Sequence, residues 1–172
     1  MIIILIGYMG SGKSTIGKKL SQTLNFEFID LDDYIQEMEQ LTISEIFKNK
    51  GEIYFRKQEH FYLKEVLKRN NVILSLGGGT PCYGDNMQAI LTTEGAHSIY
   101  LKSTILNLVQ RLVTEKSQRP LIAHLKTDEA LTEFVGKHLF ERSFYYSQSN
   151  QILLTDGKTI EGITEEIVAG LF

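Results

Sequence analysis

The stretch GYMGSGKST, residues 7–15, follows the apolar run MIIILI, residues 1–6. It satisfies the pattern G-x-x-x-x-G-K-[ST], whose last two positions are Lys13 and Ser14. Glycines let such a loop turn its amide groups inward, and the helix that follows adds its positive N-terminal end, so an anion is held without a large net charge. The preceding strand pattern and the following helical pattern are the context that the motif requires. We therefore expect a nucleoside triphosphate site, with a plain glycine-rich turn as the alternative.

We call residues 7–15 the phosphate loop, and we expect both its side chains and its backbone to bind the triphosphate. Lys13 is expected to reach the β and γ phosphates, and the Ser14 hydroxyl is expected to ligate Mg²⁺. The expected triphosphate-binding residues of the loop are Gly10, Ser11, Gly12, Lys13, Ser14 and Thr15. The loop does not identify the acceptor of the phosphate.

The composition indicates one ordinary globular domain, residues 1–172, with 42% hydrophobic and 23% charged residues. The formal net charge of −3 provides no positive field for nucleic acid, so a bound anion must be met by locally placed cations. A single cysteine, Cys82, fits a reducing cytoplasm. The apolar start is too short for a signal peptide or a membrane anchor, and no coiled-coil pattern is present. We expect a cytoplasmic monomer without a membrane or nucleic-acid partner.

Short apolar runs alternate with longer segments of helical period, which is typical of a mainly parallel sheet with helices on both faces. The strand candidates are Ile2–Ile6, Phe26–Ile29, Val72–Leu76, Ser98–Leu101 and Gln151–Leu154. Five helical stripes are formed by Ile16, Leu20 and Leu24; Phe55, Tyr62 and Val66; Ile105, Leu108, Val109 and Leu112; Leu131, Phe134, Val135 and Leu139; and Ile160, Ile163, Ile167 and Leu171. The fold class is therefore α/β.

The segment TEKSQRPLIAHLKT, residues 114–127, interrupts this rhythm. It is polar and basic, and it carries one of only two prolines. Long excursions of this kind in a compact domain are often functional. We predict that residues 114–127, the lid segment, form a mobile surface lid.

Two carboxylates follow the second strand candidate in the stretch FIDLDD. Strand alternation would put Asp30 and Asp32 on one face, and ligands of open parallel sheets bind at the carboxyl ends of the strands. We expect Asp30 to hold Mg²⁺, directly or through water, and Asp32 to accept hydrogen bonds from an alcohol as a candidate base. Asp33 is expected to be the N-cap of a helix that begins near Tyr34. The alternative is that all three acids only cap that helix.

Glycines and arginines provide further candidates for the acceptor side. The glycine strip, Gly77–Gly79, follows the third strand candidate, where backbone can approach a ligand closely. Arg56, Arg119 and Arg142 each lie in a segment that could face the carboxyl edge of the sheet. Any one of these arginines, taken alone, is typical of a solvated surface.

The ordered set GYMGSGKST, FIDLDDYI, GEIYFRKQE, LSLGGGTP, QRPLI and ERSFYY resembles the shikimate kinase family, and the similarity spans nearly the whole chain. The resemblance implies a three-layer α/β/α P-loop kinase fold with a five-stranded parallel sheet in the order 2-3-1-4-5. It also implies transfer of the γ-phosphate of ATP to the 3-hydroxyl of shikimate, a step of chorismate and aromatic amino-acid biosynthesis. The helical segment at about residues 32–62 would then bind the acceptor.

The resemblance also implies residue roles. Asp32 would bind the hydroxyls of shikimate, and the carboxylate would pair with Arg56 and Arg142. The backbone of Gly78 and Gly79 would line the acceptor. The remaining implied contacts involve Arg119 of the lid segment, which would act on the transferring phosphoryl group with Lys13, and Arg111, the nearest match to an arginine that packs on adenine.

Glu59 lies three residues after Arg56 on one predicted helix, so we expect it to orient that arginine. Two other functions stay open. A related small-molecule or nucleotide kinase would share the phosphate loop and the lid, but a neutral acceptor would not require both Arg56 and Arg142. A non-catalytic nucleotide-binding module could lose several members of the set Lys13, Ser14, Asp30, Asp32 and Arg119, and none is lost here.

Overall fold

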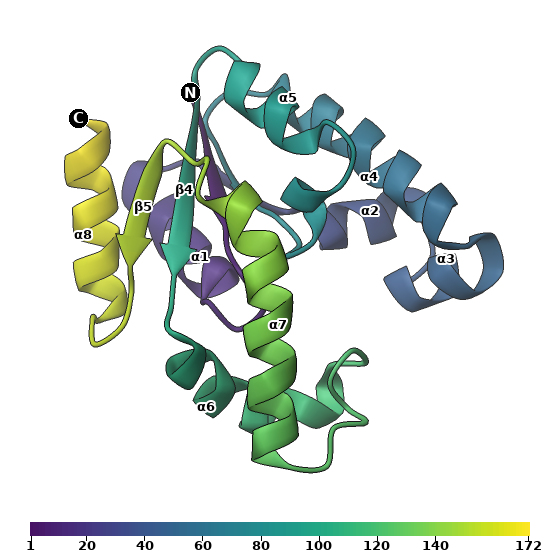
Figure 1. Ribbon diagram of the computed structural model, residues 1–172. Coiled ribbons are helices and arrows are strands. Elements are labelled where there is room, and N and C mark those ends of the chain that lie inside the picture. Colours follow the sequence, from purple (N-terminus) through teal and green to yellow (C-terminus); the bar gives the residue numbers. More distant parts are fainter.

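The computed structural model describes residues 1–172, and its centre is one parallel sheet (Figure 1). The strands are paired in the order β2-β3-β1-β4-β5, and every pairing is parallel. This confirms the expected sheet and its order. The bounds are β1 Ile2–Ile6, β2 Glu27–Asp30, β3 Val72–Ser75, β4 Ala96–Lys102 and β5 Gln151–Leu154.

Eight α-helices connect and cover the strands. Each of the five predicted stripes lies on a helix, whereas two short helices, α3 and α5, were not predicted. The bounds are α1 Lys13–Leu24, α2 Leu31–Glu39, α3 Ile43–Lys50, α4 Glu52–Leu67, α5 Asn86–Thr92, α6 Ile105–Glu115, α7 Asp128–Tyr146 and α8 Ile160–Leu171. Two short 3-10 helices are η1, Thr80–Cys82, and η2, Lys116–Gln118.

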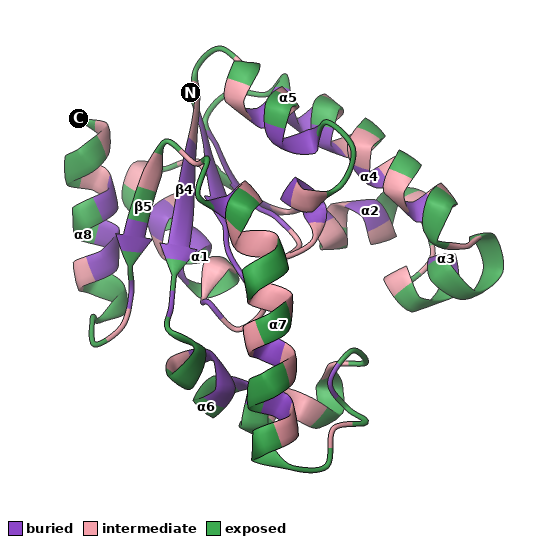
Figure 2. Ribbon diagram, in the orientation of Figure 1, coloured by how far each residue is buried: buried purple, intermediate pink, exposed green.

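The two faces of β1 show why the fold has three layers. All five of its residues are buried, as a central strand of a parallel sheet requires. Ile4 and Ile6 belong to the larger core, which α4, α6 and α7 help to form, while Ile3 and Leu5 belong to the smaller core with residues of α1 and α8. Figure 2 shows this buried centre and the exposed outer sides of the helices.

The lid segment is mostly exposed, but one of its residues is buried. Helix α6 continues to Glu115, and η2 follows it directly. Ile122 is fully buried in the larger core, so this side chain anchors the middle of the segment. The mobility of the lid segment stays a prediction. No helix of the chain has the length and apolar character needed to cross a membrane.

Candidate active site

The candidate site is a cleft of about 1440 Å³ at the carboxyl edge of the sheet. Its walls come from the phosphate loop, the ends of β2 and β3, and helices α3, α4 and α7, with part of the lid segment. In an open parallel sheet this edge is where ligands bind. One continuous cavity is thus lined by the acidic pair, the glycine strip and the arginines, as we expected.

The shape of the phosphate loop depends on its glycines. Gly10 and Gly12 have φ values of 79° and 91°, which are left-handed conformations that side chains disfavour. A Cβ atom at Gly7 would lie 2.6 Å from the Ser11 hydroxyl and 2.9 Å from the carbonyl oxygen of Leu101. Gly12 is the N-cap of α1, and no acidic residue occupies the first turn of this helix. The loop therefore ends at a helix N-terminus that is suited to phosphate.

Lys13 lies over the phosphate loop that it belongs to. Its Nζ donates hydrogen bonds to the carbonyl oxygens of Gly7 at 2.7 Å and Tyr8 at 3.0 Å. Burial lowers the pKa of Lys13 to about 8, against the opposing effect of the Asp30 and Asp32 carboxylates. The ammonium group is thus held inside the cleft and remains mainly charged at neutral pH.

A smaller cavity of about 230 Å³ adjoins the same loop. Arg111 lines it and donates from Nη1 to the carbonyl oxygen of Gly10 at 3.0 Å. Thr155 and Lys158, in the turn between β5 and α8, line it too. These two residues were not predicted from the sequence, although a polar turn at the carboxyl end of a fifth strand was a usable signal. The cavity brings Arg111 beside the phosphate loop, as a nucleotide-contacting residue would require.

The acidic pair is arranged differently from the strand pattern that we expected. Asp30, not Asp33, is the N-cap of α2: its Oδ1 accepts hydrogen bonds from the amides of Asp32 at 3.1 Å and Asp33 at 3.4 Å. The helix begins at Leu31, so Asp32 lies in its first turn and strand alternation does not orient it. The correction has a simple cause, because an aspartate at a strand end reaches the amides two and three residues ahead.

Capping leaves the second oxygen of Asp30 available. Ser14 donates its hydroxyl to Asp30 Oδ2 at 3.3 Å, which places a hydroxyl and a carboxylate side by side. Oxygen donors of this kind are the ligands that Mg²⁺ prefers. No group of three or more histidine, cysteine, aspartate or glutamate residues is placed to hold a metal ion, so any Mg²⁺ here would take its other ligands from phosphate or water.

Asp32 has the most perturbed carboxyl group of the cleft. Its pKa is raised from 3.8 to about 6, first by burial and then by the negative charges of Asp30 and Glu59, while Lys13 opposes the rise. The carboxylate lies against the glycine strip, since a Cβ atom at Gly77 would be 3.0 Å from Asp32 Oδ1. A strongly perturbed carboxyl group in a cleft is typical of a functional residue.

Two arginines from different helices converge on the glycine strip. A Cβ atom at Gly79 would lie 3.3 Å from Arg56 Nη2 and 3.4 Å from Arg142 Nη2. At Gly78 it would lie 3.0 Å from Arg142 Nη1. A side chain at Gly78 or Gly79 would crowd the guanidinium groups, so the strip and the arginines form one cationic wall of the cleft.

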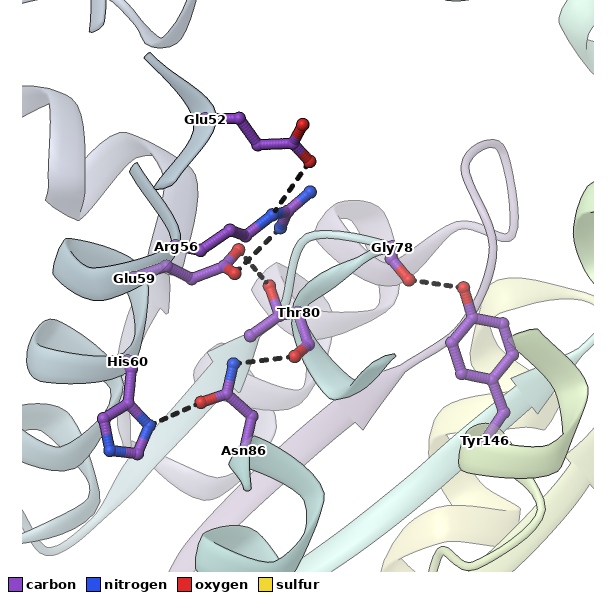
Figure 3. Close-up of polar contacts among 8 residues, drawn as sticks. All are labelled: Glu52, Arg56, Glu59, His60, Gly78, Thr80, Asn86 and Tyr146. Carbon is purple, nitrogen blue, oxygen red and sulfur yellow. Dashed lines mark hydrogen bonds and ion pairs between the residues drawn. The ribbon is translucent and has the colours of Figure 1, made fainter. Parts of the chain in front are cut away.

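Aromatic rings and hydrogen bonds hold this wall. The guanidinium carbon of Arg56 lies 3.6 Å from the ring centroid of Tyr83, and that of Arg142 lies 5.8 Å from the ring centroid of Tyr8. Tyr146, which is buried, donates its hydroxyl to the carbonyl oxygen of Gly78 (Figure 3). Nothing local in the sequence indicates this long-range contact.

Glu59 pairs with Arg56 as predicted, with 2.8 Å between Glu59 Oε1 and Arg56 Nη1 (Figure 3). Arg119 lines the cleft, but its Nε donates to Glu115 at 2.8 Å within its own part of the chain. The structure therefore brings the phosphate loop, Asp32, Arg56 and Arg142 together. The guanidinium group of Arg119 is instead paired with Glu115, which lies outside the phosphate loop.

The fold and the site define a P-loop phosphotransferase whose cleft carries two converging arginines beside the phosphate loop. The family model described as "Shikimate kinase" matches residues 9–171. A shikimate kinase of Flavobacterium psychrophilum is 48% identical over 171 residues, which cover 99% of this chain and 98% of that protein. The chain belongs to the shikimate kinase family.

Solved structures agree with this membership. The crystal structure of shikimate kinase from Bacteroides thetaiotaomicron matches with a TM-score of 0.90 and 37% identity, and the match covers 99% of this chain and 98% of that one. Shikimate kinase from Acinetobacter baumannii, in complex with shikimate, matches with a TM-score of 0.85 and 27% identity over 99% of this chain and 92% of that one.

Proposed function

We propose that this protein transfers the γ-phosphate of ATP to the 3-hydroxyl of shikimate, which gives shikimate 3-phosphate and ADP. The observation that carries the proposal is the convergence of Arg56 and Arg142 on Gly79, in the same cleft as the phosphate loop. Membership of the shikimate kinase family supports the same reaction.

The acceptor side suits a small carboxylic acid that carries hydroxyl groups. Arg56 and Arg142 present planar guanidinium groups, which bind a carboxylate through two parallel hydrogen bonds, and lysine cannot do this. They also provide local positive charge in a protein whose net charge is −3. Gly78 and Gly79 leave space beside these groups for the ring of the acceptor. The arginines therefore select the acid, and Asp32 meets its hydroxyls.

Asp32 orients the reacting hydroxyl and accepts its hydrogen bond. With a pKa of about 6 the carboxyl group is mainly ionised at pH 7.5, and it is more basic than an ordinary aspartate. A proton that leaves the hydroxyl during transfer would go to this carboxylate. Phosphoryl transfer needs little covalent assistance, so positioning and charge neutralisation supply most of the rate.

The donor side holds the triphosphate. The amides of the phosphate loop and the N-terminus of α1 bind phosphate oxygens, and Lys13 neutralises charge on the β and γ phosphates. Ser14 and Asp30 fit Mg²⁺, because their oxygens lie 3.3 Å apart and both residues line the cleft. When bound, Mg²⁺ would neutralise charge on the phosphates. Arg111 would contact the nucleotide from the smaller cavity, together with Thr155 and Lys158.

The lid segment completes the site. Arg119 would exchange Glu115 for the transferring phosphoryl group when residues 114–127 close over the cleft. Closure excludes water and so limits hydrolysis of ATP. Ile122, buried in the larger core, would be the fixed point of this motion. We further propose that the protein acts as a monomer in the cytoplasm.

The test concerns the carboxylate of shikimate. Shikimate and its methyl ester carry the same three hydroxyls, but the ester has no negative charge. We expect kcat/KM for the ester to be lower by about a hundredfold, because two charge-assisted arginine contacts are lost. ADP release would be measured with both acceptors at matched ATP and Mg²⁺, with gluconate and nucleoside monophosphates as further acceptors. Equal efficiencies for acid and ester would contradict the proposed acceptor site.

A further inference from the structure

The orientation of Arg56 depends on a carboxylate that is almost completely buried. Glu59 is 1% exposed, and its Oε1 accepts the Arg56 Nη1 donor at 2.8 Å. The other acidic neighbour of Arg56 is Glu52, which is largely exposed, and its Oε1 lies 3.9 Å from Arg56 Nε. A buried carboxylate is costly unless both of its oxygens have hydrogen-bond partners. The second oxygen of Glu59 therefore decides how firmly the pair is held.

Thr80 supplies that second partner. Its hydroxyl donates to Glu59 Oε2 at 2.9 Å, and the residue is fully buried (Figure 3). Thr80 directly follows Gly79, and its amide donates to the carbonyl oxygen of Gly77 at 3.0 Å, which closes a turn across the glycine strip. One side chain thus joins the strip to the carboxylate that holds Arg56.

Two further side chains fix Thr80 from the opposite side. Asn86 is 1% exposed, and its Nδ2 donates to the carbonyl oxygen of Thr80 at 2.8 Å. His60 Nδ1 lies 2.7 Å from Asn86 Oδ1 and is the donor of that bond, because this amide oxygen can only accept. The chain of contacts leads from the partly exposed His60 to the guanidinium group of Arg56 (Figure 3).

We propose that Thr80 is a positioning residue for the acceptor, whose hydroxyl holds Glu59 so that Arg56 and the glycine strip face the carboxylate of shikimate as one unit. This inference rests on the proposed function. Without the hydroxyl, Glu59 Oε2 is buried and unpaired, and the carboxylate turns both oxygens to Arg56. The guanidinium group then moves away from Gly79. The phosphate loop takes no part in these contacts, so ATP binding is unaffected.

The test compares Thr80→Val, which removes the hydroxyl at similar volume, with Thr80→Ser, which retains it. We expect the Kd of shikimate to rise about tenfold in the valine variant and to return to within about threefold of wild type in the serine variant. The Kd of ATP should stay within about twofold in both. Thr164→Val is the matched control, because Thr164 is also buried but bonds to the carbonyl oxygen of Ile160 on α8. The inference is overturned if valine leaves shikimate binding unchanged, weakens both ligands equally, or is not rescued by serine.

A double-variant cycle separates positioning from general loss of structure. If Thr80 acts through Arg56, Thr80→Val should cost no further shikimate affinity in an Arg56→Ala protein. A further loss of tenfold in that background would overturn the inference. Should the valine variant fail to fold by circular dichroism, Thr80→Ala, which adds no volume, enters the same cycle. Wild-type turnover is measured in parallel: its absence with shikimate would refute the proposed function, whereas an active wild type with an unaffected valine variant would refute only the role of Thr80.

Discussion

Asp32→Asn should stabilise the folded protein while it damages the enzyme. The pKa of Asp32 rises from 3.8 to about 6 on folding, mainly because burial disfavours the ionised form. At about 1.4 kcal/mol for each tenfold change in proton affinity, the ionised carboxylate costs roughly 3 kcal/mol of folding free energy. The N-terminus of α2 favours a negative charge at this position by up to about 1 kcal/mol, and asparagine loses that gain. We therefore expect a net increase of about 2 kcal/mol in the free energy of unfolding at pH 7.5.

The size of this stabilisation depends on pH. The folded protein binds a proton at Asp32 more tightly than the unfolded chain does, so between pH 3.8 and about 6 the wild type becomes less stable as the pH rises. The full penalty is present above that window. The advantage of Asp32→Asn should therefore be largest above pH 6 and should shrink as the pH falls toward 4.5.

Urea unfolding, followed by circular dichroism at several pH values from 4.5 to 8, measures this difference. Asp33→Asn is the matched control: the pKa of Asp33 is also raised by burial, but its side chain is exposed and solvent screens its charge, so the gain should be much smaller. If Asp32→Asn were no more stable than wild type at pH 7.5, or if its advantage did not change with pH, the argument that the cleft disfavours this carboxylate would fail.

Activity of the same variant should fall at least a hundredfold, and a pH-rate profile that kept the acidic limb of the wild type would argue against Asp32 as the base.

Three further variants divide the site into its donor and acceptor sides. Lys13→Ala should reduce turnover by at least a hundredfold with an unchanged circular dichroism spectrum, and unchanged turnover would remove the assignment of the phosphate loop. Arg142→Lys retains the charge but loses the planar fork, so calorimetry should show about a tenfold weaker binding of shikimate and little change for ATP; equal losses for both ligands would contradict this role. Arg111→Ala should raise the KM of ATP by about fivefold and leave the KM of shikimate unchanged, because Arg111 contacts the phosphate loop and does not line the cleft that contains Arg56 and Arg142. A rise in the KM of shikimate alone would contradict the assignment of Arg111 to nucleotide binding.

Local patterns in the sequence were sufficient for the parts of the site that depend on neighbouring residues. The phosphate loop is continuous in the chain, and its strand, β1, has the predicted bounds. Arg56 and Glu59 pair because they are three residues apart on one helix. The sheet order came instead from the resemblance to a known family, since alternation of strands and helices does not by itself specify it.

Contacts between distant segments could not be predicted in this way. Thr80 meets Glu59, and Tyr146 meets Gly78, only because helices α4 and α7 pack near the glycine strip. The sequence could not single out Asp30 rather than Asp33 as the cap, because an Asp-rich stretch offers several caps and only the path of the backbone decides among them. Ile122 lies in a polar segment, so its burial had no periodic signal.

The most direct test of the account is shikimate-dependent release of ADP. Purified protein with ATP and Mg²⁺ would be assayed in a coupled system, with and without shikimate, and the product would be identified by ³¹P NMR. We expect rapid ADP release only when shikimate is present, with one phosphate on the 3-hydroxyl for each ADP formed. Equal ADP release with and without shikimate would contradict it.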